Sequence, residues 1–165
     1  MRKNKQQNKK AKLAVKTKKE SFRFQVAYAQ EQKEIDLETW GDKLESELDT
    51  ICGNGLAEDL MTLQQIVADV RKDVGVSPEP VKNSLNDTLV PFILGITNGL
   101  PASEAEYKPA VFAEVQPLQV FIAYGNEVRN TVVDWIRAHY DGVTTRMGQP
   151  ILKLKNMVLE IKRVV

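Results

Sequence analysis

The chain has 165 residues, 42% of them hydrophobic, which is enough for one domain with a buried core and an additional tail. The single cysteine, Cys52, excludes an internal disulfide and a cysteine-cluster metal site. No apolar run reaches the roughly 18–20 residues of a membrane span, and the basic N-terminus lacks the apolar stretch of a secretion signal. We therefore expect no membrane span.

The net charge of +1 hides a strong segregation of charge along the chain. Residues 1–24 carry ten Lys or Arg and one acid, which gives +9. Residues 25–128 carry six Lys or Arg and eighteen acids, which gives −12, and residues 129–165 carry seven and three, which gives +4. Such asymmetry indicates a charged partner and does not determine the fold.

Residues 1–34 are predicted to form a basic arm with a helical extension. The first 19 residues are mainly Lys, Asn and Gln, too poor in apolar side chains to pack on their own. Every second residue from Phe22 to Tyr28 is aromatic or valine, as in a strand. The flanking Ala, Gln and Glu residues favour a helix, which we predict over 20–34.

Residues 35–165 are predicted to form a helical bundle domain. Asp36 can cap a helix that ends at Gly53, and Asn54 can cap a second helix that ends at Gly75. Both segments carry apolar side chains at helical spacing, so each should bury one face in a core.

The middle of the chain is predicted to continue as helix. Ser77-Pro78 is a cap followed by proline at the first helical position, and the helix should reach a break at Pro91. The apolar run over 92–96 should be deeply buried.

Three further helices are expected in the last third of the chain. A short helix should run from Pro117 to Gly125, and a longer one, capped by Asn126, should cover 127–140. Residues 143–149 are expected to be a polar loop, and a last helix should begin at Pro150. The fold class predicted from these elements is all-α, a bundle of about six helices with a basic arm that is extended or helical.

We expect the arm to bind nucleic acid through its phosphates, at one phosphate per cation and with release of counterions. Lysine predominates over arginine, which suits contact with phosphate more than reading of bases, so binding should be independent of sequence. The alternatives are a solubilising tail, a targeting tail, or attraction to anionic lipid. The predicted contact residues are Arg2, Lys3, Lys5, Lys9, Lys10, Lys12, Lys16, Lys18, Lys19 and Arg23.

A second, thinner basic set lies near the C-terminus and consists of Arg129, Arg137, Arg146, Lys153, Lys155, Lys162 and Arg163. Arg129 and Arg137 are eight residues apart and can share one helix face, and Arg146 lies in the following loop. Two interpretations stay open: a second strip of phosphate contacts, or the ordinary surface charges of a bundle.

The remaining candidate residues favour structure over chemistry. Phe22, Phe24 and Tyr28 can stack on bases, but docking of the arm on the body or on a neighbour is the simpler interpretation. His139 and Cys52 lack the partners of a catalytic or metal site. We therefore predict a protein that is not an enzyme and that has no cofactor or metal.

These features suit repeated packing of copies along a nucleic acid. In its arm Arg2–Arg23, the continuation Phe22–Glu34 and the helix run Asp36–Val165, the chain resembles the major coat proteins of filamentous archaeal double-stranded DNA viruses. The resemblance implies a virion location, an arm that wraps duplex DNA, and a second copy or a paralogous coat subunit as partner. We accordingly predict a structural coat, or nucleocapsid, protein that packages nucleic acid and self-assembles.

Other classes share the basic arm and stay open. One is a cellular nucleic-acid-associated protein of the cytoplasm, associated with the nucleoid or the ribosome. Another is an internal or scaffold protein of a tailed-phage particle. The last is a helical adaptor whose basic tail serves only solubility or targeting.

Overall fold

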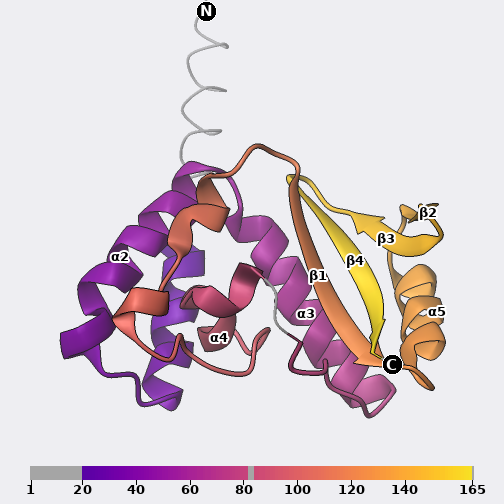
Figure 1. Ribbon diagram of the computed structural model, residues 1–165, viewed down its shortest axis with the longest axis horizontal. Helices are drawn as coiled ribbons and strands as arrows, with labels where there is room; N and C mark the ends of the chain where they lie inside the picture. The colour runs from indigo at the N-terminus through magenta and orange to yellow at the C-terminus, as the bar shows by residue number, and fades with distance from the viewer. Residues whose placement is uncertain (1–19, 82–83, 165) are drawn as a thin grey trace, which may run out of the picture.

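The computed structural model describes residues 20–81 and 84–164, and it overturns the predicted all-α fold: the chain is mixed α/β (Figure 1). Helices dominate the first part of the described chain, and a four-stranded sheet follows. The helices are one over residues 20–32, α2 Leu37–Gly53, α3 Ala57–Asp73, α4 Val90–Ile93 and α5 Arg129–His139. Three short 3-10 helices are η1 Ser84–Asp87, η2 Glu104–Glu106 and η3 Pro109–Ala113. The strands are β1 Leu118–Gly125, β2 Val143–Arg146, β3 Gln149–Lys153 and β4 Met157–Val164.

The start of α2 confirms the predicted cap. The carboxylate of Asp36 accepts hydrogen bonds from Glu38 N at 3.0 Å and from Thr39 Oγ1 at 2.8 Å. The bond from Thr39, followed by that from Glu38, lowers the pKa of Asp36. The predicted helix 20–34 is also present, over residues 20–32.

The predicted cap of the second helix is wrong. Asn54 is the C-cap of α2, and α3 begins three residues later. The Asn54 side chain instead donates to the carbonyl of Phe112 at 2.8 Å. The side-chain amide of Asn54, which the sequence pattern assigned to a helix cap, thus makes a contact with a residue far away in the chain.

The predicted helix from Ser77 to Pro91 is also wrong. Residues 75–81 have no regular secondary structure, and Pro78 is followed two residues later by Pro80, which has no N–H for a helical hydrogen bond. Glu79 N donates to the carbonyl of Ala123 in β1 at 2.7 Å. The segment therefore follows the edge of the sheet. The apolar run beyond it is largely buried, as predicted.

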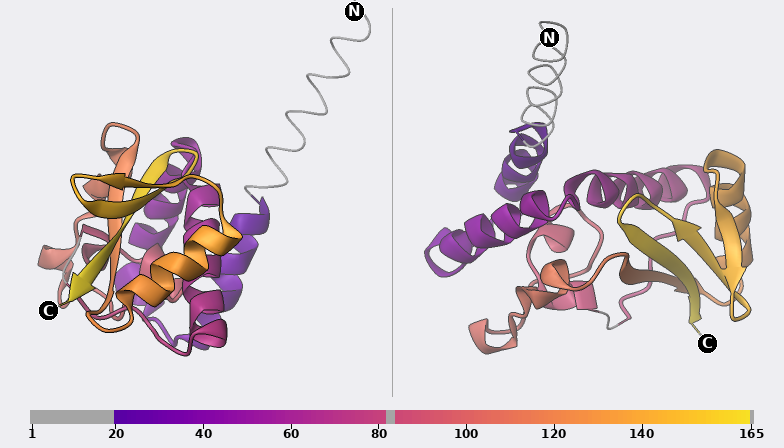
Figure 2. Two further views of the ribbon diagram at one scale, coloured as in Figure 1. Left: turned by 90° about the vertical axis from the view of Figure 1, so that its right-hand side faces the viewer. Right: turned by 90° about the horizontal axis from the view of Figure 1, so that it is seen from above.

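The sheet has the strand order β1-β4-β3-β2. β1 and β4 pair in parallel, whereas β4 with β3 and β3 with β2 pair antiparallel. α5 connects β1 to the β2–β3 hairpin. α3 and α5 pack on the same face of the sheet, and none of the described helices lies over the opposite face (Figures 1 and 2).

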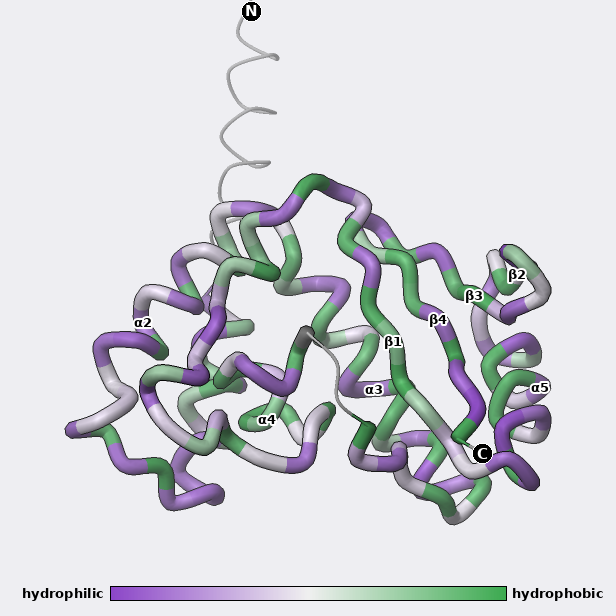
Figure 3. Tube along the Cα trace, viewed as in Figure 1, coloured by the Kyte–Doolittle hydropathy of each residue, from purple (hydrophilic) through white to green (hydrophobic). Residues whose placement is uncertain are grey.

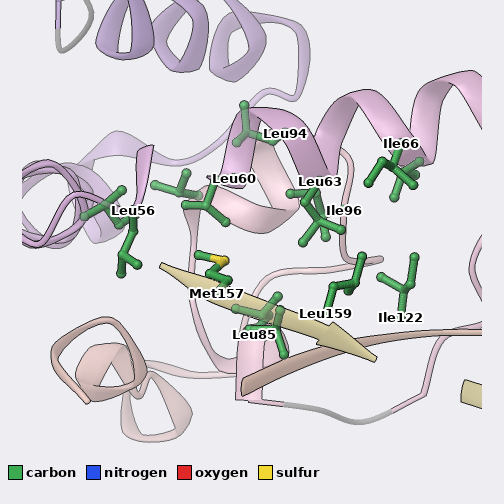
Figure 4. Close-up of a cluster of buried hydrophobic side chains, with 14 of the residues drawn as sticks. Leu56, Leu60, Leu63, Ile66, Leu85, Leu94, Ile96, Ile122, Met157 and Leu159 are labelled. Carbon is green, nitrogen blue, oxygen red and sulfur yellow. The ribbon is translucent and has the colours of Figure 1, made fainter. Parts of the chain in front are cut away.

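The main core lies between α3 and the strands β1 and β4. Leu60, Leu63 and Ile66 of α3 are fully buried and lie opposite Met157 and Leu159 of β4 (Figure 4). The tube coloured by hydropathy shows the matching hydrophobic stretches along β1 and the start of β4, with hydrophilic breaks toward the C-terminal end of β4 (Figure 3). Arg163 lies at this end of β4.

Two predicted helices are in fact strands. The segment from Pro117 to Gly125 contains β1, and the predicted last helix contains β3 and β4. In β4, Met157, Leu159 and Ile161 alternate along one face, which is a period of two. Val158 on the other face is buried as well, and burial on both faces hides the alternation of a strand.

The predicted polar loop over 143–149 contains β2 and the tight turn of a hairpin. Met147 and Gly148 form the turn, with φ of 51° and 78°. Positive φ at both central positions is typical of a type I′ turn, which usually carries Asn-Gly. Met147 at the first position hid the hairpin from the sequence pattern.

A buried carboxylate fixes the helix α3 to the β3–β4 turn. Asp59 accepts from Lys155 N at 3.2 Å and from Asn156 N at 2.6 Å. Burial raises the pKa of Asp59, and the two backbone hydrogen bonds oppose that shift. The contact joins residues nearly one hundred positions apart and sets the position of the sheet on the helix.

A second buried carboxylate lies among the helices. Glu47 of α2 accepts from Leu89 N at 3.0 Å and from Val90 N at 2.6 Å, at the start of α4, and Tyr107 Oη donates to it at 3.3 Å. Burial raises the pKa of Glu47 to about 7, against the effect of these bonds.

Within residues 20–81 and 84–164, no helix is long and apolar enough to cross a membrane.

Candidate nucleic-acid interface

The basic arm enters the described structure only at its last cation. The other nine predicted arm cations lie in residues 1–19, outside the described residues. Arg23 pairs with Glu45 at 3.1 Å and with Asp49, both on α2. Burial acts to lower the pKa of Arg23, but the bond to Glu45 and the charge of Asp49 outweigh it and raise the pKa. Its charge is thus neutralised within the body, which competes with the predicted phosphate contact.

The aromatic residues after the arm divide into two groups. Phe22 is 3% exposed and Val26 is fully buried, and both belong to the same core cluster as Trp40 of α2. Docking on the body is therefore confirmed for Phe22. Phe24 and Tyr28, four residues apart on the same helix, are 72% and 63% exposed. The helix over 20–32 is fixed by one face and leaves these two rings open to a partner.

A groove of about 370 Å³ lies between α5 and the β2–β3 hairpin, and we name it the α5 groove. Apolar Val133 and Pro150, together with Gly148, complete its lining. Its side chains that bear charged or polar groups are Arg129, Asn130, Asp134, Arg137 and Thr145.

The structure brings together two of the three basic residues predicted near the C-terminus. Arg129 and Arg137 share the α5 groove, as their spacing on one helix predicted. Arg146 lies at the end of β2, paired with Gln149. Because side chains alternate along a strand, Arg146 lies on the opposite face of the hairpin from Thr145, which lines the groove.

Arg163, a member of the second basic set of the sequence, lies beside this groove. Its Nη2 donates to Asn130 Oδ1 at 3.1 Å, at the start of α5. Burial lowers the pKa of Arg129, and the positive charge of Arg163 lowers it further. Only the pairing of β4 with β1 places Arg163 beside α5, so the assignment of this segment to a helix concealed the contact.

Neither Arg129, the first residue of α5, nor Arg163 of β4 has an ion pair with a carboxylate among the described residues. Arg129 Nη1 donates to the carbonyl of Ile161 at 3.4 Å, and its Nε is buried without a hydrogen-bond partner. Arg137 differs, since it lies 3.7 Å from Asp134 one turn earlier on α5. The cations without such an ion pair are therefore Arg129, which lines the groove, and Arg163, which lies beside it through its hydrogen bond to Asn130.

His139 and Cys52, the two residues considered as catalytic or metal-binding candidates, occupy structural positions. His139 stacks on Trp135 at 4.1 Å between ring centroids, and its Nδ1 lies 2.7 Å from the Trp135 carbonyl. Cys52 is buried at the end of α2, as predicted. No group of three or more His, Cys, Asp or Glu side chains suited to a metal ion occurs in the described part of the chain.

No protein-family model matches the chain, and no curated protein sequence matches it.

Proposed function

We propose that this protein binds the phosphate backbone of a nucleic acid through its N-terminal cations, without catalysis and without reading base sequence. The observation that carries the proposal is the segregation of charge. Residues 1–24 have ten cations and one acid, whereas residues 25–128 have eighteen acids and six cations. Phosphate neutralisation with counterion release supplies nearly all of the affinity of such sequence-independent binding.

The docked helix over 20–32 supports the proposal. It buries Phe22 and Val26 and pairs Arg23 with α2, so the helix that follows the cation-rich segment in the chain is fixed on the body. Since Arg23 is engaged, nine cations in residues 1–19 are left for phosphate. Eight of the ten arm cations are lysines, which contact phosphate as point charges.

The narrower proposal is a coat protein of a virion that assembles on its nucleic acid. The open rings of Phe24 and Tyr28 favour it, because exposed aromatic residues beside a charged arm suit a contact between copies. Of the three features behind the resemblance to filamentous-virus coat proteins, the helix run Asp36–Val165 does not hold, because it contains a sheet, and the narrower proposal therefore rests on the arm and on the helix that follows it.

The test is binding of a fluorescent random-sequence duplex at salt concentrations from roughly 50 to 200 mM. If six or more cations engage, affinity should fall by on the order of a thousandfold across this range. A variant lacking residues 1–19 should lose most of the binding and most of the salt dependence. Truncation must stop there, because removing Phe22 would also remove core contacts.

A second variant controls for the truncation: the Lys and Arg of residues 2–19 are replaced by Gln in the full-length chain. Both variants should keep the circular dichroism and melting temperature of the wild type. Negative-stain images of the bound state distinguish the narrower proposal, since a coat protein forms regular filaments. Absence of binding by the wild type would leave the adaptor class as the remaining explanation of the arm.

A further inference from the structure

The α5 groove combines features that the fold does not need for its own stability. Arg163, which donates to Asn130 next to Arg129 in the chain, lies close enough for its positive charge to disfavour the charge of Arg129, and neither arginine is paired with a carboxylate in the described residues. Keeping two like charges together without a counter-charge destabilises the folded state slightly. An anionic ligand would remove that repulsion.

We propose that the α5 groove is a second backbone-binding site, which takes a phosphodiester strand with Arg129 and Arg163 on neighbouring phosphates. The inference rests on the proposed function, and it adds a contact surface on the folded body to the one supplied by the arm. Asn130 positions Arg163 through the hydrogen bond at 3.1 Å. The carbonyl of Ile161 holds Arg129 at 3.4 Å.

The neutral residues of the groove favour phosphate as the ligand. The Asn130 amide, the Thr145 hydroxyl and the backbone N–H of Gly148 add hydrogen-bond donors beside the arginines. Such donors supply many of the contacts that proteins make to phosphate oxygens. The planar arginine fork also binds phosphate through two parallel hydrogen bonds.

The length of the groove fits a strand. Arg129 and Arg137 are eight residues apart on α5, which is about 12 Å along the helix axis. At about 3.4 Å of rise per nucleotide, this distance covers three to four nucleotides of one strand. Arg137 is the weaker contact, because Asp134 lies 3.7 Å from it.

The structure also provides a matched control. Arg146 is an exposed arginine of the same hairpin, but it lies on the face opposite the groove. Arg146→Gln therefore removes one positive charge from the same region without touching the proposed site. A general effect of net charge and an effect of the groove can be separated by comparing, per charge removed, this variant with R129Q/R163Q, which removes two charges.

The first measurement uses the full-length protein and a random-sequence duplex. For R129Q/R163Q, the slope of log affinity against log salt should become shallower by about 1.8, which is about 0.9 for each lost phosphate contact. For Arg146→Gln, the change in slope should stay below about 0.5. Equal changes in slope per charge removed would overturn the proposal. R129K/R163K keeps both positive charges and loses only the bidentate hydrogen bonds of the guanidinium groups. Its affinity for the duplex should therefore lie between that of the wild type and that of R129Q/R163Q.

The second measurement does not depend on the arm. A four-thymidine oligonucleotide is titrated into the full-length protein, and amide chemical shifts are followed by NMR. Shifts at residues 129–131 and 145–148 that disappear in R129Q/R163Q would support the groove even if the duplex test of the arm failed. Shifts confined to other residues, or no shifts, would overturn it.

A competing ligand is an acidic segment of a second copy. Light scattering at high protein concentration tests this class directly. Self-association of the wild type that is lost in R129Q/R163Q, with unchanged nucleic-acid affinity, would assign the groove to a contact between copies and overturn the proposal. Melting curves of each variant confirm that the fold is retained.

Discussion

Arg23 and Arg163 are both arginines that reach from one element to a neighbouring helix, yet the charges of the groups around them differ. Arg23 contacts two carboxylates of α2, Glu45 and Asp49. Arg163 contacts the neutral amide of Asn130 and lies near a second arginine. The difference separates two uses of one residue type: the first arginine fixes a helix to the body, and the second leaves a positive charge available to a ligand.

The same division applies to the aromatic residues of the first helix. The side chain of Phe22 packs in the core, whereas that of Phe24, two residues later, is exposed. The comparison of the two arginines depends on this docking, because Arg23 can reach α2 only while the helix over 20–32 stays in place.

Substitution of Phe22 is therefore the strongest way to break the comparison. Phe22→Ala should lower the free energy of unfolding by about 3 kcal/mol, because it removes a buried ring and leaves a cavity. Phe24→Ala, at an exposed position, should change it by less than about 0.5 kcal/mol. Urea unfolding followed by circular dichroism measures both. Similar values for the two variants would mean that the helix is not docked as described.

Glu47 extends the comparison to a buried acid that has no ion pair with a cation among the described residues. Its carboxylate accepts from Leu89 N and Val90 N, and Tyr107 Oη lies 3.3 Å both from this carboxylate and from the Lys43 carbonyl. One hydroxyl hydrogen cannot serve two acceptors. A protonated Glu47 would donate to Tyr107 and free that hydrogen for Lys43, so the geometry agrees with a pKa raised by burial.

The second prediction is a loss of stability as the pH rises. The pKa of Glu47 is about 7 in the folded state and 4.5 in its ordinary state, so the folded protein binds this proton more tightly than the unfolded chain. The resulting stability is complete below about pH 4.5 and lost as the pH rises through about 7, by up to about 3 kcal/mol. Urea midpoints at pH 5, 6, 7 and 8 measure this decline.

Glu47→Gln is the matched control for that decline. Glutamine keeps one acceptor oxygen for the backbone N–H groups and gains a donor toward Tyr107, so it imitates the protonated acid. The variant should lose most of the dependence on pH between 5 and 8. A decline in the variant as steep as in the wild type would assign the effect to other groups.

The helices of the N-terminal half could largely be predicted from sequence, because their signals are local. Asp36 caps α2 through residues two and three positions away, and the apolar spacing of α3 survives in its buried face. The sheet could not be predicted in this way. β4 begins with three consecutive buried residues, Met157 to Leu159, and Met147 occupies the first position of a turn that usually carries Asn.

The candidate site likewise has one part that local sequence spacing predicts and another part that depends on strand pairing. The shared face of Arg129 and Arg137 follows from helical spacing alone, and the structure places both in one groove. The contact of Arg163 with Asn130 depends on a parallel pairing between strands nearly forty residues apart, which leaves no local signal. The sequence pattern predicts a loop around Arg146, and a loop does not define which face a side chain lies on. In the structure, Arg146 lies on the face of the hairpin opposite the α5 groove.

The smallest expected effect tests the comparison directly. Arg23→Gln should lower the free energy of unfolding by less than about 1 kcal/mol, since Glu45 and Asp49 are largely exposed and such ion pairs contribute little in water. It should also leave duplex affinity within about twofold of wild type, because the charge of Arg23 is already neutralised by α2. Replacement of Lys19, outside the described residues, provides the contrast: K19Q should weaken binding while stability stays unchanged. If Arg23→Gln weakens binding as much as K19Q does, the ion pairs on α2 open in the complex, and Arg23 belongs to the phosphate-binding arm after all.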